Sequence, residues 1–175
     1  VQSLQNCLKI KRTISVLKLK VLSNLMPIVT RSDIIDLSSE NKTEELANKI
    51  LGKLKIGDIV FLYGEMGIGK TTFIRYLING LQKKNKLKLS EVTSPTFNIL
   101  NEYEINQTKI KHYDLFRLKS ATEIKNLNIF GDSKNSITLI EWPQIIKEPP
   151  ENLIEIIFNY EADYKKRSVK IIGLD

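Results

Sequence analysis

The sequence predicts an α/β fold, with a mainly parallel central sheet flanked by helices and with added antiparallel strands. Residues 64–71 (GEMGIGKT) satisfy the phosphate-loop pattern G-x-x-x-x-G-K-[ST]. Five apolar residues fall within residues 57–63, directly before this pattern, and residues 72–81 carry apolar positions at helical spacing. Strand, glycine loop and helix in this order form a nucleotide-binding unit of parallel α/β proteins. The predicted fold class is therefore P-loop NTPase-like.

One helix is expected before this unit, beginning at residues 39–41. Its apolar face recurs at three- and four-residue spacing and consists of Leu46, Ala47, Ile50, Leu51 and Leu54. Asn41, followed three residues later by Glu44, predicts the N-terminal cap of this helix. Residues 27–37 form a lead-in to the helix, and residues 55–58 form a turn into the first strand.

Strands and one short helix are expected after the phosphate loop. The helix that follows the loop ends near Gln82, and residues 94–96 (SPT) break the chain before a hairpin whose turn lies at residues 105–107. The last two strands are expected to pair as antiparallel neighbours. The full set comprises strands at residues 98–104, 108–118, 136–140, 153–160 and 167–174, and a helix at residues 121–127.

The phosphate loop carries the chemistry that this fold class predicts. Glycines allow backbone N–H groups to curl around a phosphate chain, and the following helix adds partial positive charge at its N-terminus. Lys70 can reach the β- and γ-phosphates, and the hydroxyl of Thr71 can ligate Mg²⁺. The predicted nucleotide-binding residues of the loop are Gly64, Gly67, Ile68, Gly69, Lys70, Thr71 and Thr72.

A phosphate loop also requires an acid that helps to hold Mg²⁺. Residues 137–141 and residues 110–114 both end in such an acid, Glu141 and Asp114 respectively. The first run is almost continuously apolar, as a central parallel strand should be, whereas the second contains polar residues and is expected to be half exposed. We therefore assign Glu141 to the metal, with one of the waters of Mg²⁺ between them. Asp114 then lies behind the metal or orients the attacking water, unless it only caps a turn.

Two residues beside these acids have open roles. His112 is the only histidine of the sequence, and it either touches the active site or packs without a catalytic part. Trp142 directly follows Glu141 and either packs beneath the nucleotide or belongs to the core.

The composition fits one globular domain. The chain has 175 residues, of which 42% are hydrophobic and 27% charged, and this length can bury a substantial core. No run of about 18 apolar residues occurs, so no membrane span is expected. The single cysteine, Cys7, excludes an intrachain disulfide and a cysteine metal site, and it favours a reducing, cytoplasmic setting.

The net charge of +7 is concentrated near the N-terminus. The first 32 residues hold six basic residues and no acid, whereas the rest of the chain holds 21 basic and 20 acidic residues. This nearly neutral remainder argues against a broad nucleic-acid-binding face. We expect residues 1–29 to be a basic extension without a catalytic part, either disordered or translated from upstream of the true start. Residues 30–175 are expected to form the P-loop domain.

Four motifs together resemble one known family. They are residues 64–72 (GEMGIGKTT), residues 94–97 (SPTF), residues 112–118 (HYDLFRL) and residues 141–144 (EWPQ). A phosphate loop alone is unspecific, but the other three motifs in this order and spacing are specific. From about residue 33 onward, the sequence is similar to the TsaE (YjeE) family of small bacterial P-loop ATPases of tRNA N6-threonylcarbamoyladenosine (t6A) synthesis.

The resemblance implies a Mg²⁺-dependent ATPase that is required for the modification of adenosine 37 of tRNA. Its implied partners are the threonylcarbamoyl transferase and the inactive paralogue of that enzyme, which are subunits of the TsaD and TsaB type. ATP hydrolysis, weak in the isolated protein, would reset their complex for further turnovers. Contact with tRNA would be only indirect, and no membrane is involved.

The resemblance also implies roles for individual residues. Thr71 and Glu141 correspond to the family's Mg²⁺ ligands, and Asp114 corresponds to an aspartate that hydrolysis requires. Residues 94–96 match a switch-like segment near the γ-phosphate, which gives Thr96 a part in catalysis together with Lys70. By position more than by motif, the residues that border the adenine are Ser39, Glu40 and Thr43.

A small-molecule or nucleotide kinase is the alternative function, because kinases of this kind also use a phosphate loop. Such kinases usually have an arginine-bearing lid, and the arginines after residue 32 are only Arg75, Arg117 and Arg167, none in an evident finger position. A GTPase is rejected, because residues 41–44 (NKTE) match the guanine motif N-K-x-D only in part and precede the phosphate loop. A module that binds nucleotide without turnover is a further alternative.

Overall fold

The computed structural model describes residues 34–131, 133–151, 153–161 and 164–174. The expected basic extension, residues 1–29, lies outside the described residues. Residues 34–175 form one compact unit, to which all the elements below belong.

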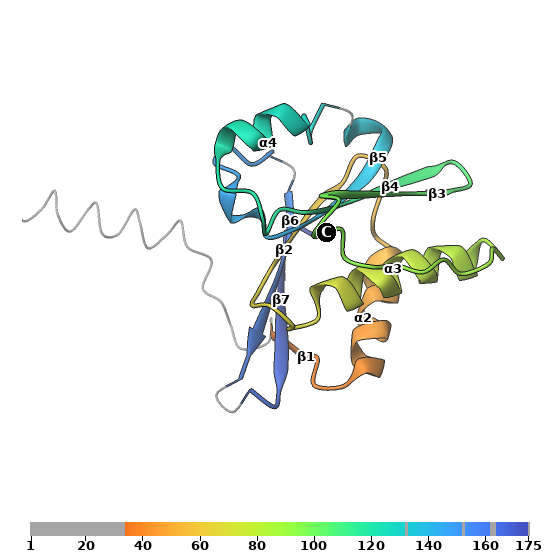
Figure 1. Ribbon diagram of the computed structural model, residues 1–175. Coiled ribbons are helices and arrows are strands. Elements are labelled where there is room, and N and C mark those ends of the chain that lie inside the picture. Colours follow the sequence, from red (N-terminus) through yellow and green to blue (C-terminus); the bar gives the residue numbers. More distant parts are fainter. Residues whose placement is uncertain (1–33, 132, 152, 162–163, 175) are drawn as a thin grey trace, which may run out of the picture. The chain divides into compact units, whose positions relative to one another are not determined.

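Within this described part, seven strands form a single sheet. They are β1 Ile34–Asp36, β2 Ile59–Tyr63, β3 Leu100–Ile105, β4 Thr108–Asp114, β5 Ser136–Glu141, β6 Leu153–Tyr160 and β7 Arg167–Ile172. Their order across the sheet is β1-β7-β6-β2-β5-β4-β3 (Figure 1). β2 pairs in parallel with β5 and β6, and β5 pairs in parallel with β4, whereas the outer pairs are antiparallel. The predicted fold class is therefore confirmed.

Helices cover both faces of the sheet (Figure 1). They are α2 Glu40–Leu51, α3 Lys70–Lys84 and α4 Ala121–Leu127, and two short 3₁₀ turns, η2 Ser133–Asn135 and η3 Pro143–Ile145, flank β5. Val60 and Leu62 of β2 pack into the core beneath α2 and α3, whereas Ile59 and Phe61 pack into the core beneath α4. Because successive side chains of a strand point to opposite faces, a strand buried on both faces must be apolar throughout. β2 meets this requirement directly before the phosphate loop.

The ends of α2 differ from the prediction. Ser39 is the N-cap, and its hydroxyl oxygen accepts a hydrogen bond from the backbone N–H of Lys42. Asn41 was wrongly predicted as the cap and lies inside the first turn, because Ser39 already has the extended conformation that lets a short side chain reach back to that turn. The helix ends at Leu51, with Gly52 as its C-cap, instead of continuing to Leu54.

The predicted lead-in contains a short edge strand. β1 pairs with β7, from Ile34 opposite Lys170 to Asp36 opposite Ser168. Three residues are too few for the alternation that would identify a strand in the sequence. The next backbone N–H, that of Leu37, donates a hydrogen bond of 2.7 Å to the carbonyl oxygen of Arg167. The start of α2 is thereby fixed beside the start of β7.

β4 is buried, and the expectation that it is half exposed was wrong. Every residue from Ile110 to Asp114 is buried, because the strand lies between β3 and β5 and a hydrophobic core packs on each of its faces. Tyr113 packs into the core beneath α4, whereas Ile110 packs into the core beneath α2 and α3. His112 and Asp114 alternate with Tyr113, so they share the face of Ile110. The polar residues that suggested exposure are therefore inward-facing groups.

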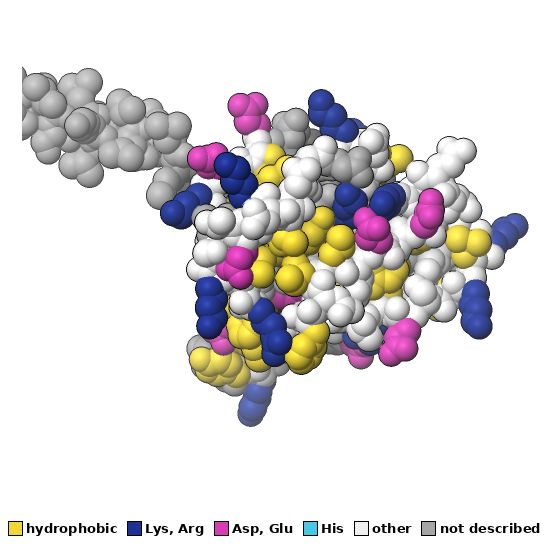
Figure 2. Space-filling view, turned by 45° about the horizontal axis from the view of Figure 1, so that its top comes forward, with side chains coloured by type: hydrophobic (Ala, Val, Ile, Leu, Met, Phe, Trp, Pro, Cys, Tyr) yellow, Lys and Arg dark blue, Asp and Glu magenta, His cyan; other side chains and the backbone are white. Residues whose placement is uncertain are grey.

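Charged side chains of both signs are interspersed over the face seen in Figure 2. This arrangement agrees with the nearly neutral charge of the chain after residue 32. Exposed hydrophobic side chains also occur, and Phe97 is the most exposed of those described, at 79%. Within the described residues, none of the helices has both the length and the apolar character needed to cross a membrane.

Candidate functional site

The phosphate loop joins β2 to α3 and requires glycine at two places. Gly64 has φ 142°, and a Cβ atom there would lie 3.0 Å from the carbonyl oxygen of Phe158. Gly69 is the N-cap of α3 with φ 113°, and a Cβ atom there would lie 3.2 Å from Nη1 of Arg167. Residues with side chains rarely adopt these conformations. Glycine is therefore needed where the loop passes close to Phe158 and Arg167, and the loop leads into the N-terminus of α3, a position that can bind phosphate through backbone N–H groups.

The other predicted residues of the loop are close by. Gly67 has a left-handed backbone conformation, with φ 78°. The side chain of Ile68 is buried in the core beneath α2 and α3. Thr72 lies in the first turn of α3, where its hydroxyl oxygen accepts a hydrogen bond of 3.1 Å from Nη2 of Arg75.

Lys70 is buried within the loop. Its Nζ donates hydrogen bonds to the carbonyl oxygens of Gly64 (2.8 Å) and Glu65 (2.9 Å). Burial lowers the pKa of the ammonium group below its ordinary value, and the charges of Glu141 and Asp114 partly oppose this shift. Lys70 therefore shares one electrostatic environment with both of the predicted acids.

Trp142 lies beside this lysine. Its φ of 58° is a left-handed conformation that is rare for a bulky residue, and strain of this kind clusters at functional sites. In this conformation the centre of the indole ring lies 4.0 Å from Nζ of Lys70. The centres of the Trp142 and Phe116 rings lie 4.8 Å apart. Trp142 also packs against the core beneath α4, so it belongs to the edge of that core and lies beside the phosphate-loop lysine.

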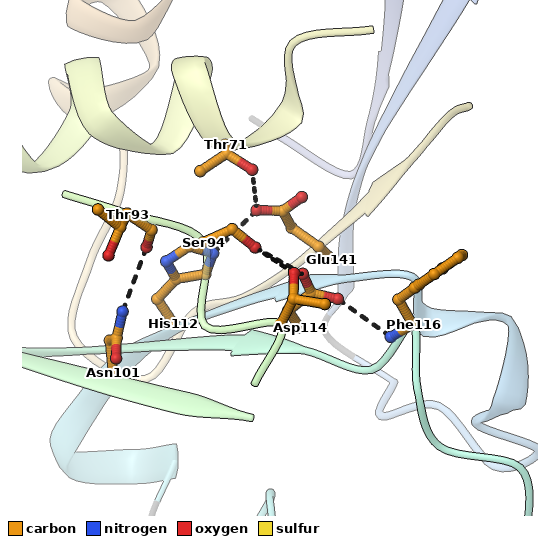
Figure 3. Close-up of polar contacts among 9 residues, drawn as sticks. Thr71, Thr93, Ser94, Asn101, His112, Asp114, Phe116 and Glu141 are labelled. Carbon is orange, nitrogen blue, oxygen red and sulfur yellow. Dashed lines mark hydrogen bonds and ion pairs between the residues drawn. The ribbon is translucent and has the colours of Figure 1, made fainter. Parts of the chain in front are cut away.

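Glu141 receives hydrogen bonds from two elements (Figure 3). The hydroxyl of Thr71, in the first turn of α3, lies 2.7 Å from Oε1 of Glu141 and donates to it. Nε2 of His112, on β4, lies 3.0 Å from the same oxygen. Glu141 is only 3% exposed, so its carboxylate is held between a helix terminus and a neighbouring strand.

This pair of oxygen ligands fits Mg²⁺. Mg²⁺ is usually bound by one or two protein oxygens together with phosphates and water, and not by a cage of side chains. The described residues contain no cluster of three or more His, Cys, Asp or Glu side chains that could hold a metal. Both hydrogen bonds to Glu141 fall on Oε1, which leaves Oε2 for a cation or one of its waters. Thr71 and Glu141 can therefore hold Mg²⁺ once a phosphate chain is bound.

Asp114 lies opposite Glu141 in the pairing of β4 with β5, but it has different partners. The hydroxyls of Ser94 (2.6 Å) and Thr96 both donate hydrogen bonds to its Oδ2 (Figure 3). The backbone N–H of Phe116 donates to its Oδ1 at 3.0 Å. Asp114 thus caps the turn after β4, as one alternative held, and it also binds the predicted switch-like segment.

The residues predicted to border the adenine cluster at the start of α2. The hydroxyl of Thr43 donates a hydrogen bond of 3.3 Å to the carbonyl oxygen of Ser39, and Thr43 is buried. Glu40 accepts a hydrogen bond of 2.7 Å from the hydroxyl of Tyr76 on α3. The side chain of Glu40 is exposed, whereas the side chain of Thr43 is buried.

Arg167 connects this region to the phosphate loop, and sequence reasoning missed it. Its Nη1 donates a hydrogen bond of 3.3 Å to the carbonyl oxygen of Ile68, and its backbone N–H donates one of 3.4 Å to the hydroxyl of Ser38. The sequence separation from Ile68 is 99 residues. The pairing of β7 with β6, and of β6 with β2, brings the two together, so no local pattern could have identified this arginine.

Comparisons with known proteins identify the family of this chain. A protein-family model described as "Threonylcarbamoyl adenosine biosynthesis protein TsaE" matches residues 37–169. A protein named tRNA threonylcarbamoyladenosine biosynthesis protein TsaE from Rickettsia conorii is 43% identical over 140 residues, which are 78% of this chain and 75% of the relative. A protein of the same name from Aquifex aeolicus is 36% identical over 135 residues, which are 77% of this chain and 92% of the relative.

A solved structure also shares the fold. The crystal structure of YdiB from Bacillus subtilis superposes with a TM-score of 0.63 at 22% sequence identity, covering 81% of this chain and 85% of that chain. This likeness supports the P-loop fold alone. Because the family model covers most of the chain and both relatives are more than 30% identical over most of their lengths, the chain belongs to the TsaE family of threonylcarbamoyl adenosine biosynthesis proteins.

Proposed function

We propose that this protein is a Mg²⁺-dependent ATPase of tRNA t6A biosynthesis, which binds the threonylcarbamoyl transferase and its inactive paralogue and resets their complex by hydrolysing ATP. The observation that carries the proposal is the meeting of Lys70, Thr71 and Glu141 at one phosphate loop in a chain of the TsaE family. The names of the relatives place those proteins in tRNA t6A biosynthesis. The chain after residue 32 has 21 basic and 20 acidic residues, and this nearly neutral charge favours protein partners over direct tRNA binding. The proposed setting is the cytoplasm.

In this proposal, the phosphate loop and the start of α2 hold ATP together. Residues 64–72 supply backbone N–H groups and the ammonium group of Lys70 to the phosphates. Ser39, Glu40 and Thr43 border the base. Arg167 supports this reading, because its bonds to Ser38 and Ile68 hold the start of α2 beside the loop.

Thr71 and Glu141 are the proposed ligands of Mg²⁺. The bound ion would supply positive charge to the phosphate oxygens on which negative charge develops. The chain's own contribution is orientation, because Thr71 and Glu141 already share a hydrogen bond of 2.7 Å. Lys70 adds a second fixed positive charge at the phosphates, and charges that are fixed in advance stabilise the transition state effectively.

Asp114 is the proposed group that orients the attacking water. Its carboxylate is 3% exposed and lies beside Glu141 at the ends of two parallel strands. A buried carboxylate at this edge can accept a hydrogen bond from water and so align it. Because Ser94 and Thr96 already donate to Oδ2, their position decides how much of the carboxylate is left for water.

The segment of residues 94–97 is the proposed link to the partner complex. Thr96 bonds the buried Asp114, whereas the next side chain, Phe97, is 79% exposed and lies 4.1 Å from the guanidinium of Arg117. One short segment therefore has one end at the site and the other in contact with the solvent. A partner that moves Phe97 can change the bonds of Asp114, as in known loop switches.

ATP turnover with and without the transferase heterodimer tests this function. We expect slow release of phosphate by the isolated protein and stimulation of at least about tenfold by the heterodimer. A kinase would instead transfer phosphate to a small acceptor and ignore the heterodimer. Absence of stimulation, together with phosphorylation of an added nucleoside monophosphate, would contradict the proposal and favour the kinase alternative.

A further inference from the structure

His112 is a fully buried side chain that the roles above do not use. It is 0% exposed and lies on β4, two residues before Asp114 and opposite Leu139 of β5. Its Nε2 lies 3.0 Å from Oε1 of Glu141. Its Nδ1 is also buried, and it forms no hydrogen bond with a described atom. A buried polar atom without a partner costs free energy, so a side chain that only fills space would be better apolar.

The pattern of contacts determines which nitrogen carries the proton. An ionised carboxylate only accepts hydrogen bonds, so the contact with Glu141 requires a proton on Nε2 of His112. The contact therefore places a proton on Nε2, which donates one directed hydrogen bond to one carboxylate oxygen.

We propose that His112 is a positioning residue for the metal carboxylate, an inference that rests on the proposed Mg²⁺ site. Its hydrogen bond and that of Thr71 both fall on Oε1 of Glu141. Two donors on one oxygen fix the rotation of the carboxylate, and the other oxygen, Oε2, is then directed to the cation or to one of its waters. Partners of this kind that orient a metal ligand alter metal affinity by about 10- to 100-fold when they are removed.

Two substitutions of similar size separate this role from simple packing. The side-chain nitrogen of Gln is as many bonds from Cα as Nε2 of His, whereas that of Asn corresponds to Nδ1. His112→Gln therefore keeps a donor in reach of Glu141, and His112→Asn does not. The measurement is the affinity for a non-hydrolysable ATP analogue, by calorimetry, over a series of Mg²⁺ concentrations and in EDTA.

We expect His112→Asn to require about tenfold more Mg²⁺ for the same gain in affinity, and His112→Gln to stay within about threefold of the unsubstituted protein. Affinity in EDTA should be equal in all three proteins, which a general loss of packing would not allow. An unchanged Mg²⁺ requirement in His112→Asn, or an equal loss in His112→Gln, overturns the positioning role. If the unsubstituted protein shows no effect of Mg²⁺ at all, the proposed metal site fails first, and this inference fails with it.

A second measurement requires no substitution. Because the sequence contains a single histidine, the imidazole ¹⁵N spectrum of the histidine-labelled full chain reports on His112 without further assignment. We expect the pattern of the tautomer with the proton on Nε2. A proton on Nδ1 alone would remove the donor to Glu141 and overturn the inference, even if both variants failed to fold.

Discussion

Glu141 and Asp114 are two carboxylates at the same edge of the sheet, yet they are held in different ways. They lie opposite each other across β4 and β5, and each is 3% exposed. The partners of Glu141 come from the first turn of α3 and from β4. The side-chain partners of Asp114 come from residues 94–96, which belong to no helix or strand.

The difference shows that two equally buried carboxylates can be supported by different kinds of structure. A carboxylate held by a helix terminus and a neighbouring strand keeps its orientation as long as the core is folded. A carboxylate held by two loop hydroxyls can change its partners when the loop moves, at the cost of only two hydrogen bonds. The carboxylate of Glu141 is therefore suited to a fixed metal site. The carboxylate of Asp114 is suited to a step that a partner protein controls.

Lys70→Ala should have the largest effect, because Lys70 lies in the field of both acids. Loss of a buried cation that faces phosphate should weaken nucleotide binding by roughly 100-fold or more. The matched control is Lys83→Ala on the same helix, where an exposed ion pair with Glu44 is lost and stability should change by less than about 0.5 kcal/mol. Calorimetric affinity and thermal melting of both variants test this, and equal affinities would refute the assignment of Lys70.

Asp114→Asn should lower ATP turnover by about 100-fold while leaving nucleotide affinity within about threefold. The amide keeps the shape of the carboxylate, but it has no negative charge and only one acceptor oxygen, so it cannot accept from Ser94, Thr96 and the N–H of Phe116 together. Asp58→Asn is the control, because Asp58 caps another turn by accepting from the N–H of Lys55 at 2.7 Å. If steady-state rates fall no more in Asp114→Asn than in Asp58→Asn, Asp114 is only a turn cap.

Glu141→Gln should raise the Mg²⁺ requirement of nucleotide binding by roughly 10-fold or more, with unchanged affinity in EDTA. The amide cannot accept from Thr71 and His112 and present a charged oxygen to a cation as the carboxylate does. A Mg²⁺ titration of analogue binding measures this. If Glu141→Gln loses turnover without a change in the Mg²⁺ requirement, and Asp114→Asn shows the reverse, the roles of the two acids are exchanged.

Features encoded by local sequence patterns could be predicted, whereas features that depend on the pairing of distant segments could not. The phosphate loop, Glu141 and most strand positions along the chain were accessible, because local patterns of glycine and apolar residues encode them. β4 was misread, because its inward-facing polar residues mimic the alternation of a half-exposed strand. Arg167 escaped notice because its contact with Ile68 depends on strand pairing between distant segments. Contacts that arise only from topology leave no signal in a single sequence.

Thr96→Ala should have the smallest effect of the four substitutions at the site. It tests most directly whether residues 94–96 control Asp114. Ser94 still donates to Asp114 in this variant, so the loss is that of one hydrogen bond, about 1 kcal/mol or roughly fivefold in rate. We expect this loss in turnover stimulated by the transferase heterodimer, with nucleotide affinity retained.

Thr93→Ala is the matched control, because Thr93 directly precedes the segment. Its hydrogen bond with Asn101 uses the backbone carbonyl, which accepts from the side chain of Asn101 at 3.2 Å and is kept in the variant. Stimulated and unstimulated rates of the two variants are compared under the same conditions. Equal stimulation of Thr96→Ala and Thr93→Ala would show that residues 94–96 do not act as a switch. Asp114 would then be held as rigidly as Glu141, and the contrast between the two carboxylates would be one of position alone.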